Sequence, residues 1–318
     1  MVSVWRSQAT SSLPWEPDRH LDVDIARSVI RGQFPSIDVQ QIRHLGSGWE
    51  FDALATGDGW VFRFPRRAEY QALFDREGPV LALARSALPP ETRVPLVELL
   101  GQPSGEFAYS FAGHRLIDGV AADSVAPNLH PEMARSIGVV LGAIHSIPIA
   151  AARAAGVTES RPGPPDDGGR AWLGRNLAGA SQLTGADPTV ARAVAWVAEL
   201  SDPLRTLDAP RRFIHHDLWP EHLVVDPATG QLVGILDWTD TLLGDAAGDF
   251  VTLAAFGGWG FLEQVLENYP HEVDEGFRQR LRFMAQFLSV MWLGEAQRLG
   301  RDIERHIAWV RNAFAAEL

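Results

Sequence analysis

The segment from Arg211 to Phe250 constrains the fold more than any other part of this sequence. Within it, two short apolar runs, 223–225 and 232–236, are separated by a Pro-Ala-Thr-Gly turn. Apolar runs of this length on either side of a Pro/Gly turn predict two strands joined as a β-hairpin. A hairpin brings its two outer ends together. We therefore expect Asp217, which precedes the first strand, to lie near Asp237, which follows the second.

Two carboxylates at one place suggest a cation site. Ionised neighbours repel each other unless a cation lies between them or one of them is protonated, and Mg²⁺ prefers oxygen ligands. The spacing of His215, Asp217 and Asp237 suits phosphoryl transfer, in which one Asp accepts the proton of the acceptor hydroxyl and another holds Mg²⁺ on the phosphates. The alternative is a hairpin that only carries surface acids.

A family resemblance rests on three parts of the same segment. These are His215-x-Asp217, Ile235-Leu236-Asp237-Trp238, and the trailing Gly244-Asp245 with Asp249. They resemble the catalytic and metal loops of the antibiotic phosphotransferases, the aminoglycoside and macrolide kinases, which share the fold of the eukaryotic protein kinases. The resemblance implies that Asp217 is the catalytic base and that Asp237 is the Mg²⁺ ligand.

His222 departs from the usual pattern of that family. It stands five residues after Asp217, where the family usually has an Asn. Because imidazole is a softer ligand than an amide oxygen, we expect His222 to belong to the metal site either as a ligand or by holding a metal-bound water or a phosphate. The sequences DLWPEH, from Asp217, and LDWT, from Leu236, resemble those of the macrolide kinases in particular.

Length and charge limit the classes of partner. The 318 residues are enough for two lobes or one large domain. A formal net charge of -12 argues against a nucleic-acid or anionic-membrane partner. The absence of cysteine excludes disulfides and thiolate chemistry in this chain. The first twenty residues lack the apolar run of a signal peptide, so we expect a cytoplasmic protein, with access to ATP and GTP.

The first third of the chain predicts a sheet. Residues 39–45, 49–56 and 60–64 are typical of an antiparallel meander with Gly at its turns, and 94–99 and 107–111 predict two further strands. Residues 22–33 predict an amphipathic helix. The resemblance implies an α+β, protein-kinase-like bilobal fold. We expect a nucleotide-binding lobe with a five-stranded antiparallel sheet over 1–111, and a larger, mainly helical catalytic and substrate-binding lobe over 112–318. The connection should fall at about 109–117, in particular at 112–117.

The predicted sheet carries the candidate nucleotide residues. The turn Gly46-Ser47-Gly48 can present backbone N–H groups to phosphates, although a plain hairpin turn fits it equally well. Arg63 lies on the opposite face of its strand from the aromatic residues, where a kinase has a Lys that contacts phosphates and pairs with a helix Glu. We expect Glu77 to be its partner, with Glu69 as second choice. The alternative for Arg63 is a surface arginine.

Three other residues of the second lobe are better explained by structure than by chemistry. His145, at the end of a predicted helix over 131–146, is expected to be structural, because a lone histidine there seldom carries chemistry. Asp249 is expected to accept backbone N–H groups near His215. Asp245 should act similarly.

The favoured function is a kinase that phosphorylates an antibiotic hydroxyl. The resemblance at His222, with the aromatic residues of the last third of the chain, favours a macrolide, phosphorylated on the 2′-hydroxyl of its amino sugar, and it implies GTP or ATP as donor. An aminoglycoside or another small hydroxyl compound is the alternative within this class. A nucleotide-binding pseudokinase and a metal-dependent phosphohydrolase are alternatives of other classes.

Overall fold

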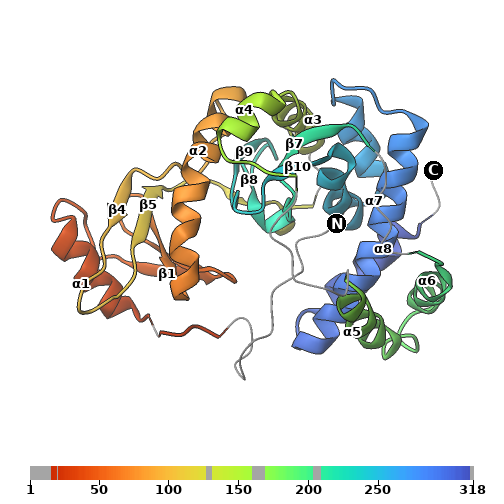
Figure 1. The fold of residues 1–318 in the computed structure, drawn as a ribbon, viewed down its shortest axis with the longest axis horizontal. Coiled ribbons are helices and arrows are strands. Elements are labelled where there is room, and N and C mark those ends of the chain that lie inside the picture. Colours follow the sequence, from red (N-terminus) through yellow and green to blue (C-terminus); the bar gives the residue numbers. More distant parts are fainter. Residues whose placement is uncertain (1–15, 20, 127–130, 160–168, 203–208, 316–318) are drawn as a thin grey trace. The chain divides into compact units, whose positions relative to one another are not determined.

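The structure is a computed structural model of the chain. It describes residues 16–19, 21–126, 131–159, 169–202 and 209–315. The chain divides into two compact units, which are described separately (Figure 1). The smaller unit contains the described residues up to Ser86 together with Arg93–Asp118. The larger unit contains Ala87–Thr92 and the chain from Gly119 onward.

The smaller unit is built on a five-stranded antiparallel sheet in the order β1-β2-β3-β5-β4. Its strands are β1 (Arg43–Ser47), β2 (Phe51–Ala55), β3 (Trp60–Pro65), β4 (Leu99–Gly101) and β5 (Phe111–Arg115). The first three predicted strands are confirmed, although β1 begins at Arg43 instead of Val39. The five-stranded antiparallel sheet itself is confirmed as well.

The last two strands lie further along the chain than we predicted. Of the predicted strand over 94–99, only Leu99 belongs to β4, because Pro95 lacks an N–H group and Leu96 N donates to Val94 O in a local turn (2.8 Å). Ser110 N donates to the Gln71 side chain instead of to a neighbouring strand (2.9 Å). Residues 112–115, predicted as part of the connection, therefore lie within β5.

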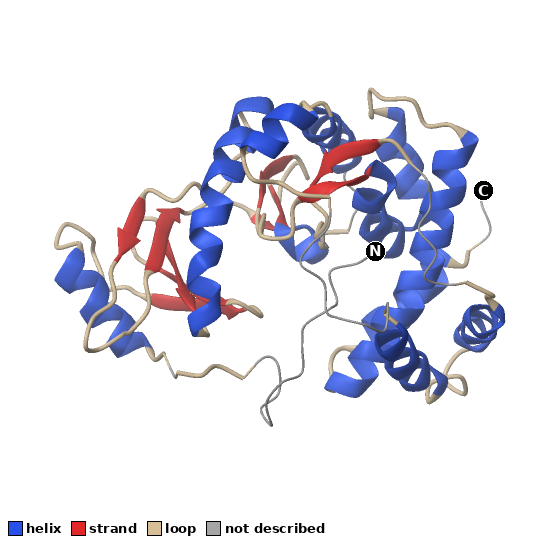
Figure 2. Ribbon diagram, viewed as in Figure 1, coloured by secondary structure: helices blue, strands red, loops and turns tan. Residues whose placement is uncertain are grey.

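Helices cover both faces of β3, because its side chains alternate. On one face, Trp60, Phe62 and Phe64 join a buried cluster with residues of α1 (Val23–Gln33). On the other face, α2 (Ala72–Ala87) contributes the partner of Arg63, as described below. A short 3-10 helix, η1 (Ala68–Gln71), precedes α2. Figure 2 shows the strands of this unit with both helices.

The larger unit is mainly helical. Its helices are α3 (Pro131–His145), α4 (Ile149–Ala154), α5 (Arg170–Ser181), α6 (Pro188–Glu199), α7 (Val251–Glu267), α8 (Glu275–Leu299) and α9 (Ile303–Ala313), with 3-10 helices η2 (Ala122–Ser124), η4 (Pro220–His222) and η5 (Ala246–Phe250). The predicted helix over 131–146 is confirmed. Helix α8 packs against α5, α7 and α9, which gives the unit its helical core. Within the described part of the chain, none of the helices combines the length and the apolar character needed to span a bilayer.

Two small sheets lie within this helical unit. Strand β7 (Arg211–Ile214) pairs antiparallel with β10 (Leu242–Asp245). Strands β6 (Val120–Ala121), β8 (Leu223–Val225) and β9 (Leu232–Ile235) form the other sheet. The predicted hairpin is confirmed, since β8 and β9 pair antiparallel across a turn that ends at Gly230 (φ 77°). Both sheets therefore place their connecting loops at the site described next.

Candidate active site

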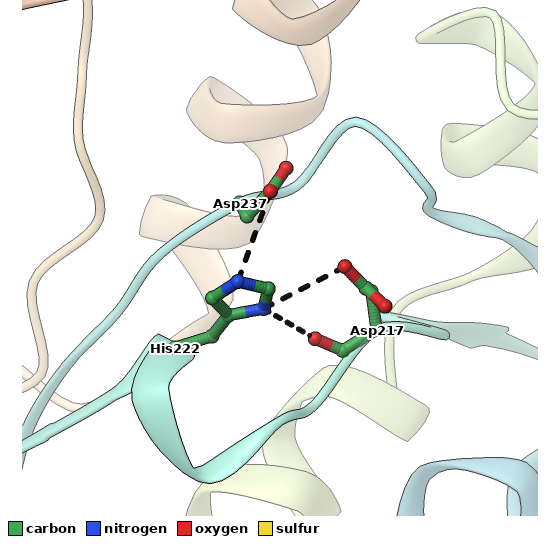
Figure 3. A group of neighbouring side chains, drawn as sticks. All are labelled: Asp217, His222 and Asp237. Carbon is green, nitrogen blue, oxygen red and sulfur yellow. Dashed lines mark hydrogen bonds and ion pairs between the residues drawn. The ribbon is translucent and has the colours of Figure 1, made fainter. Parts of the chain in front are cut away.

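The hairpin brings three predicted site residues together in the larger unit. In the hairpin register Leu223 pairs with Ile235, and Leu236 N donates to His222 O (2.8 Å), which extends the pairing to the loops. Asp217, His222 and Asp237 as a result bring one ligand atom each within 4.8 Å of one another (Figure 3). The expectation that the two carboxylates lie close together is confirmed.

His222 lies between the two carboxylates. Its Nδ1 atom is 2.8 Å from the backbone oxygen of Asp217 and 3.6 Å from Asp217 Oδ2, and its Nε2 atom is 3.8 Å from Asp237 Oδ2 (Figure 3). Because a carbonyl oxygen only accepts hydrogen bonds, Nδ1 must carry the proton. In the neutral ring, Nε2 then presents its lone pair on the side of Asp237. Burial lowers the pKa of His222, but the carboxylates of Asp217 and Asp237 outweigh it and raise the pKa above the ordinary value.

Two residues of the site have backbone angles that residues other than glycine rarely adopt. His216 has φ 68° and Asp237 has φ 58°, in the left-handed region where a Cβ atom is crowded. Such conformations persist only where surrounding contacts hold them, and they cluster at functional sites. At Asp237 one such contact comes from the Thr239 hydroxyl, which donates to Asp237 Oδ1 (2.8 Å).

Asp249 holds the loop that contains Asp217. Its carboxylate accepts the backbone N–H groups of His215 (2.9 Å) and His216 (2.7 Å), as predicted, and also bonds to His145 Nε2 (3.1 Å). Burial alone would raise the pKa of Asp249, which is 1% exposed, but the hydrogen bond and charge of His145 and the nearby His215 lower it below the ordinary value. The same carboxylate thus fixes the backbone at the strained position His216.

His145 is structural, as expected. Its Nδ1 atom bonds to the Tyr269 hydroxyl (2.7 Å), and its other nitrogen bonds to Asp249. The ring is 1% exposed, and it connects α3 with the loop after α7. Asp245 was expected to accept backbone N–H groups as Asp249 does. It accepts one, from Ala247 N (3.1 Å), and so caps η5.

His215 connects the loop to the far end of the hairpin. Its Nε2 atom donates to Leu236 O (3.0 Å), and its Nδ1 atom accepts from Asp217 N (3.3 Å). This pattern requires a neutral ring. In agreement, burial lowers the pKa of His215 to about 4, although the nearby Asp249 carboxylate raises it in part. The ring also packs against the indole of Trp238 (4.6 Å between ring centres).

Trp219 is a contact of Asp217 that sequence reasoning missed. Its indole Nε1 donates to Asp217 Oδ1 (2.8 Å). The partly exposed indole packs against Trp292 of α8 (4.6 Å between ring centres) and Trp309 of α9 (5.4 Å). The available signal was a Trp two residues after the candidate base, but nothing in the sequence indicates which way its N–H group points.

The donor set of Asp217, His222 and Asp237 fits a divalent cation. Two carboxylates and one imidazole nitrogen, all partly buried, place their ligand atoms within 4.8 Å of one another, close enough to contact one ion. Carboxylate oxygens suit Mg²⁺, whereas imidazole also suits softer metals such as Zn²⁺ or Ni²⁺. The set is therefore able to hold Mg²⁺ but is less selective for it than an all-oxygen set.

A second predicted pair lies in the smaller unit. Arg63 donates from both terminal nitrogens to the Glu77 carboxylate, at 3.0 Å and 2.5 Å, and Glu77 is 2% exposed. Glu77 of α2 is therefore the partner of Arg63, as expected. Glu69, the second choice, lies instead near Arg67 (3.5 Å). A surface role for Arg63 is excluded, because only 9% of the residue is exposed.

The three residues of the glycine turn lie at the end of the β1–β2 hairpin. Gly46 and Ser47 belong to β1, and Gly48 N donates to Phe51 O (2.9 Å), which closes the hairpin. The Ser47 hydroxyl lies 3.1 Å from His44 Nε2. A role of this turn in phosphate binding stays a prediction.

The fold is that of a kinase-like phosphotransferase. The family model of the phosphotransferase enzyme family matches residues 41–284, and the chain belongs to this family. The five-stranded antiparallel sheet and the mainly helical second unit correspond to the protein-kinase-like fold that its members share.

The chain is also similar to individual proteins, at sequence identities below 30%. The uncharacterized protein YcbJ of Bacillus subtilis (strain 168) is 27% identical over 220 residues, which cover 67% of this chain and 68% of that protein. The GDP and kanamycin complex of APH(2″)-IIia has a TM-score of 0.65 at 22% identity and covers 91% of this chain and 97% of its own. The apoenzyme of macrolide 2′-phosphotransferase MphH from Brachybacterium faecium has a TM-score of 0.58 at 22% identity, with 93% and 99% covered.

Proposed function

We propose that the protein is an antibiotic kinase that transfers the γ-phosphate of GTP or ATP to a macrolide, at the 2′-hydroxyl of its amino sugar, and so confers resistance. The observation that carries the proposal is the convergence of Asp217, His222 and Asp237 at the end of the β8–β9 hairpin. Membership of the phosphotransferase family supports it. We place the reaction in the cytoplasm, where both nucleotides are available.

Asp217 is the catalytic base in this proposal. Its carboxylate accepts the proton of the acceptor hydroxyl while the acceptor oxygen forms its bond to the γ-phosphorus and the bond to the bridging oxygen breaks, which releases GDP or ADP. Asp237 and His222 would hold Mg²⁺, which supplies charge neutralisation of the phosphates. The contacts of Asp249 and His215 keep the loop that carries Asp217 in place.

Arg63 is the proposed contact for the nucleotide phosphates in the smaller unit. Its bidentate pairing with the buried Glu77 fixes the guanidinium in one orientation, and Arg retains the charge that a kinase Lys provides at this strand position. The glycine turn at Gly46, Ser47 and Gly48 would add backbone N–H groups.

Side chains around Asp217 favour a bulky apolar acceptor. The indole of Trp219 is partly exposed beside the base. Acidic groups of the same neighbourhood, Glu221 and Asp123, are already paired with Arg305, at 2.8 Å and 3.1 Å. A polycationic aminoglycoside would instead use acids that are open to it. An aminoglycoside remains the second candidate, because one neighbour of the same fold is a GDP and kanamycin complex.

Measured nucleotide consumption tests the proposal. The purified protein is incubated with macrolides, aminoglycosides and small amino alcohols, each with GTP and with ATP in the presence of Mg²⁺, and phosphorylated products are identified by mass. We expect transfer to macrolides. Transfer only to an aminoglycoside would contradict the macrolide assignment, and acceptor-independent hydrolysis as the sole activity would favour a phosphohydrolase.

Asp217→Asn separates an enzyme from a pseudokinase. We expect kcat to fall at least about a thousandfold, because the general base is removed, while nucleotide binding measured by calorimetry persists. A wild-type protein that binds nucleotide but transfers phosphate to no acceptor in the panel would contradict the proposed activity.

A further inference from the structure

We infer that Trp219 is a positioning residue, whose indole N–H group sets the orientation of the Asp217 carboxylate. This inference rests on the proposed function, in which Asp217 is the base. Trp219 Nε1 donates to Asp217 Oδ1 at 2.8 Å, while Asp217 Oδ2 lies 3.6 Å from His222 Nδ1. The two carboxylate oxygens are thus distinguished, one by the indole and the other by the imidazole.

Two further indoles pack against the Trp219 ring. Trp292 of α8 and Trp309 of α9 pack against it, and each of these two residues is only 5% exposed. Arg305 lies over the Trp309 ring (4.6 Å) and pairs with Glu221, which is two residues after Trp219. The position of the Trp219 ring is therefore determined by two helices of the larger unit, and not by its own short loop alone.

An indole suits this role for a chemical reason. Its N–H group donates and cannot accept, so it stabilises the ionised carboxylate without competing for the proton that the base has to take. A hydrogen bond to a charged group is also stronger than one between neutral groups. The bond fixes the carboxylate in one rotamer, so less conformational entropy is lost when the base aligns with the acceptor hydroxyl.

Trp219→Phe tests the inference, because it keeps an aromatic ring in the cluster and removes only the N–H donor. We expect kcat for phosphate transfer to fall about tenfold to a hundredfold, in line with the loss of one hydrogen bond to a charged group. The KM of the nucleotide should stay within about twofold, because the donor acts on the base and not on the phosphates.

Trp259→Phe is the matched control. Trp259 is buried in α7, and its indole donates to Ala313 O (3.3 Å), far from Asp217 in the sequence and bonded to a different partner. The same substitution there also removes one indole hydrogen bond, and we expect kcat to stay within about twofold. Equal losses of kcat in the two variants would overturn the inference, as would a Trp219→Phe protein with wild-type kcat.

NMR spectroscopy tests the hydrogen bond between Trp219 and Asp217 without an activity measurement. It replaces the kinetic test if the Trp219→Phe variant folds poorly. The indole ¹⁵N–¹H signals of the 11 Trp residues are recorded for the wild type and for Asp217→Ala. We expect one indole signal to shift well beyond the others, and a spectrum without such a shift overturns the inference. A wild type without transfer activity contradicts the proposed function, whereas an active wild type matched by Trp219→Phe contradicts only the role of Trp219.

Discussion

At the scale of single residues, one buried carboxylate determines the geometry of the loop before the hairpin. Asp249 accepts two backbone N–H groups, from His215 and His216, and bonds to His145. A fully buried charge is tolerated only where several donors compensate it. The left-handed conformation of His216 is stabilised by the same contacts, so the position of Asp217 depends on a residue 32 positions further along the chain.

Asp249→Asn is expected to lower both stability and activity. The amide keeps one acceptor but turns the other oxygen into a donor that faces an N–H group, which should lower the free energy of unfolding by about 3 kcal/mol. Urea unfolding measures the loss. Asp226→Asn, in the exposed turn between β8 and β9, is the control, with an expected change below about 0.5 kcal/mol. Similar losses in both variants would contradict the role of Asp249.

His114 gives the chain a pH-dependent stability. Burial, aided by the nearby Arg63 guanidinium, lowers the pKa of His114 to about 4, and its Nδ1 bonds to Arg115 O (2.9 Å). Between about pH 6.5, its ordinary value, and pH 4, the unfolded chain binds a proton that the folded protein does not bind. The contribution of this residue to stability is therefore complete above pH 6.5 and declines as the pH falls towards 4.

Comparison with His114→Phe isolates this contribution. Between pH 7 and pH 5 the wild type should lose about 2 kcal/mol more unfolding free energy than the variant, because only the wild type carries the shifted imidazole. Urea unfolding at both pH values measures the difference. Parallel pH profiles for the two proteins would show that His114 does not titrate in this way.

At the scale of elements, strand β3 and helix α2 are joined by an ion pair that is nearly inaccessible to water. Arg63 and Glu77 combine a bidentate geometry with burial. Replacing a buried pair of this kind by apolar residues often costs little, whereas removing one partner leaves an uncompensated charge. The pair can therefore be separated into a structural contribution and a proposed nucleotide contact.

We expect Glu77→Ala to cost about 3 to 5 kcal/mol of unfolding free energy, because Arg63 loses its buried partner. The double variant Arg63→Met, Glu77→Leu should recover most of that loss, as measured by urea unfolding. Nucleotide affinity, measured by calorimetry, should stay low in the double variant, because the cation is gone. A double variant that binds nucleotide like the wild type would contradict the proposed role of Arg63.

At the scale of the whole molecule, the acidic composition should distinguish classes of acceptor. With a formal net charge of -12, the protein attracts cations over long distances, and salt screens this attraction. For a macrolide, kcat/KM should change by less than about threefold between about 50 mM and 500 mM NaCl. A polycationic acceptor should lose more than about tenfold. If kcat/KM for a macrolide fell more than about tenfold over this range of salt, the result would contradict an acceptor site in which Arg305 already neutralises the acidic groups.

Much of the fold was predictable because its signals are local. The hairpin followed from two apolar runs around a Pro/Gly turn, and the inward face of Arg63 followed from the two-residue period of a strand. The last two strands of the sheet were misplaced because their bounds depend on distant partners. Residues 112–115 form β5 because β3 pairs with all four of them and β4 pairs with Ala112 and Gly113 on the other side, and no neighbouring residue encodes that.

The proximity of Asp217 and Asp237 follows from the local sequence, because the antiparallel pairing of β8 and β9 brings the loops at the outer ends of the hairpin together. The contacts that support these loops come in part from residues far away along the chain, which only the tertiary structure brings together. The bond from His145 to Asp249 spans 104 positions, and the indole of Trp219, which donates to Asp217, packs against Trp residues of two later helices. Such contacts depend on the simultaneous packing of many side chains from distant elements, whereas turns and strand periods depend on neighbours along the chain.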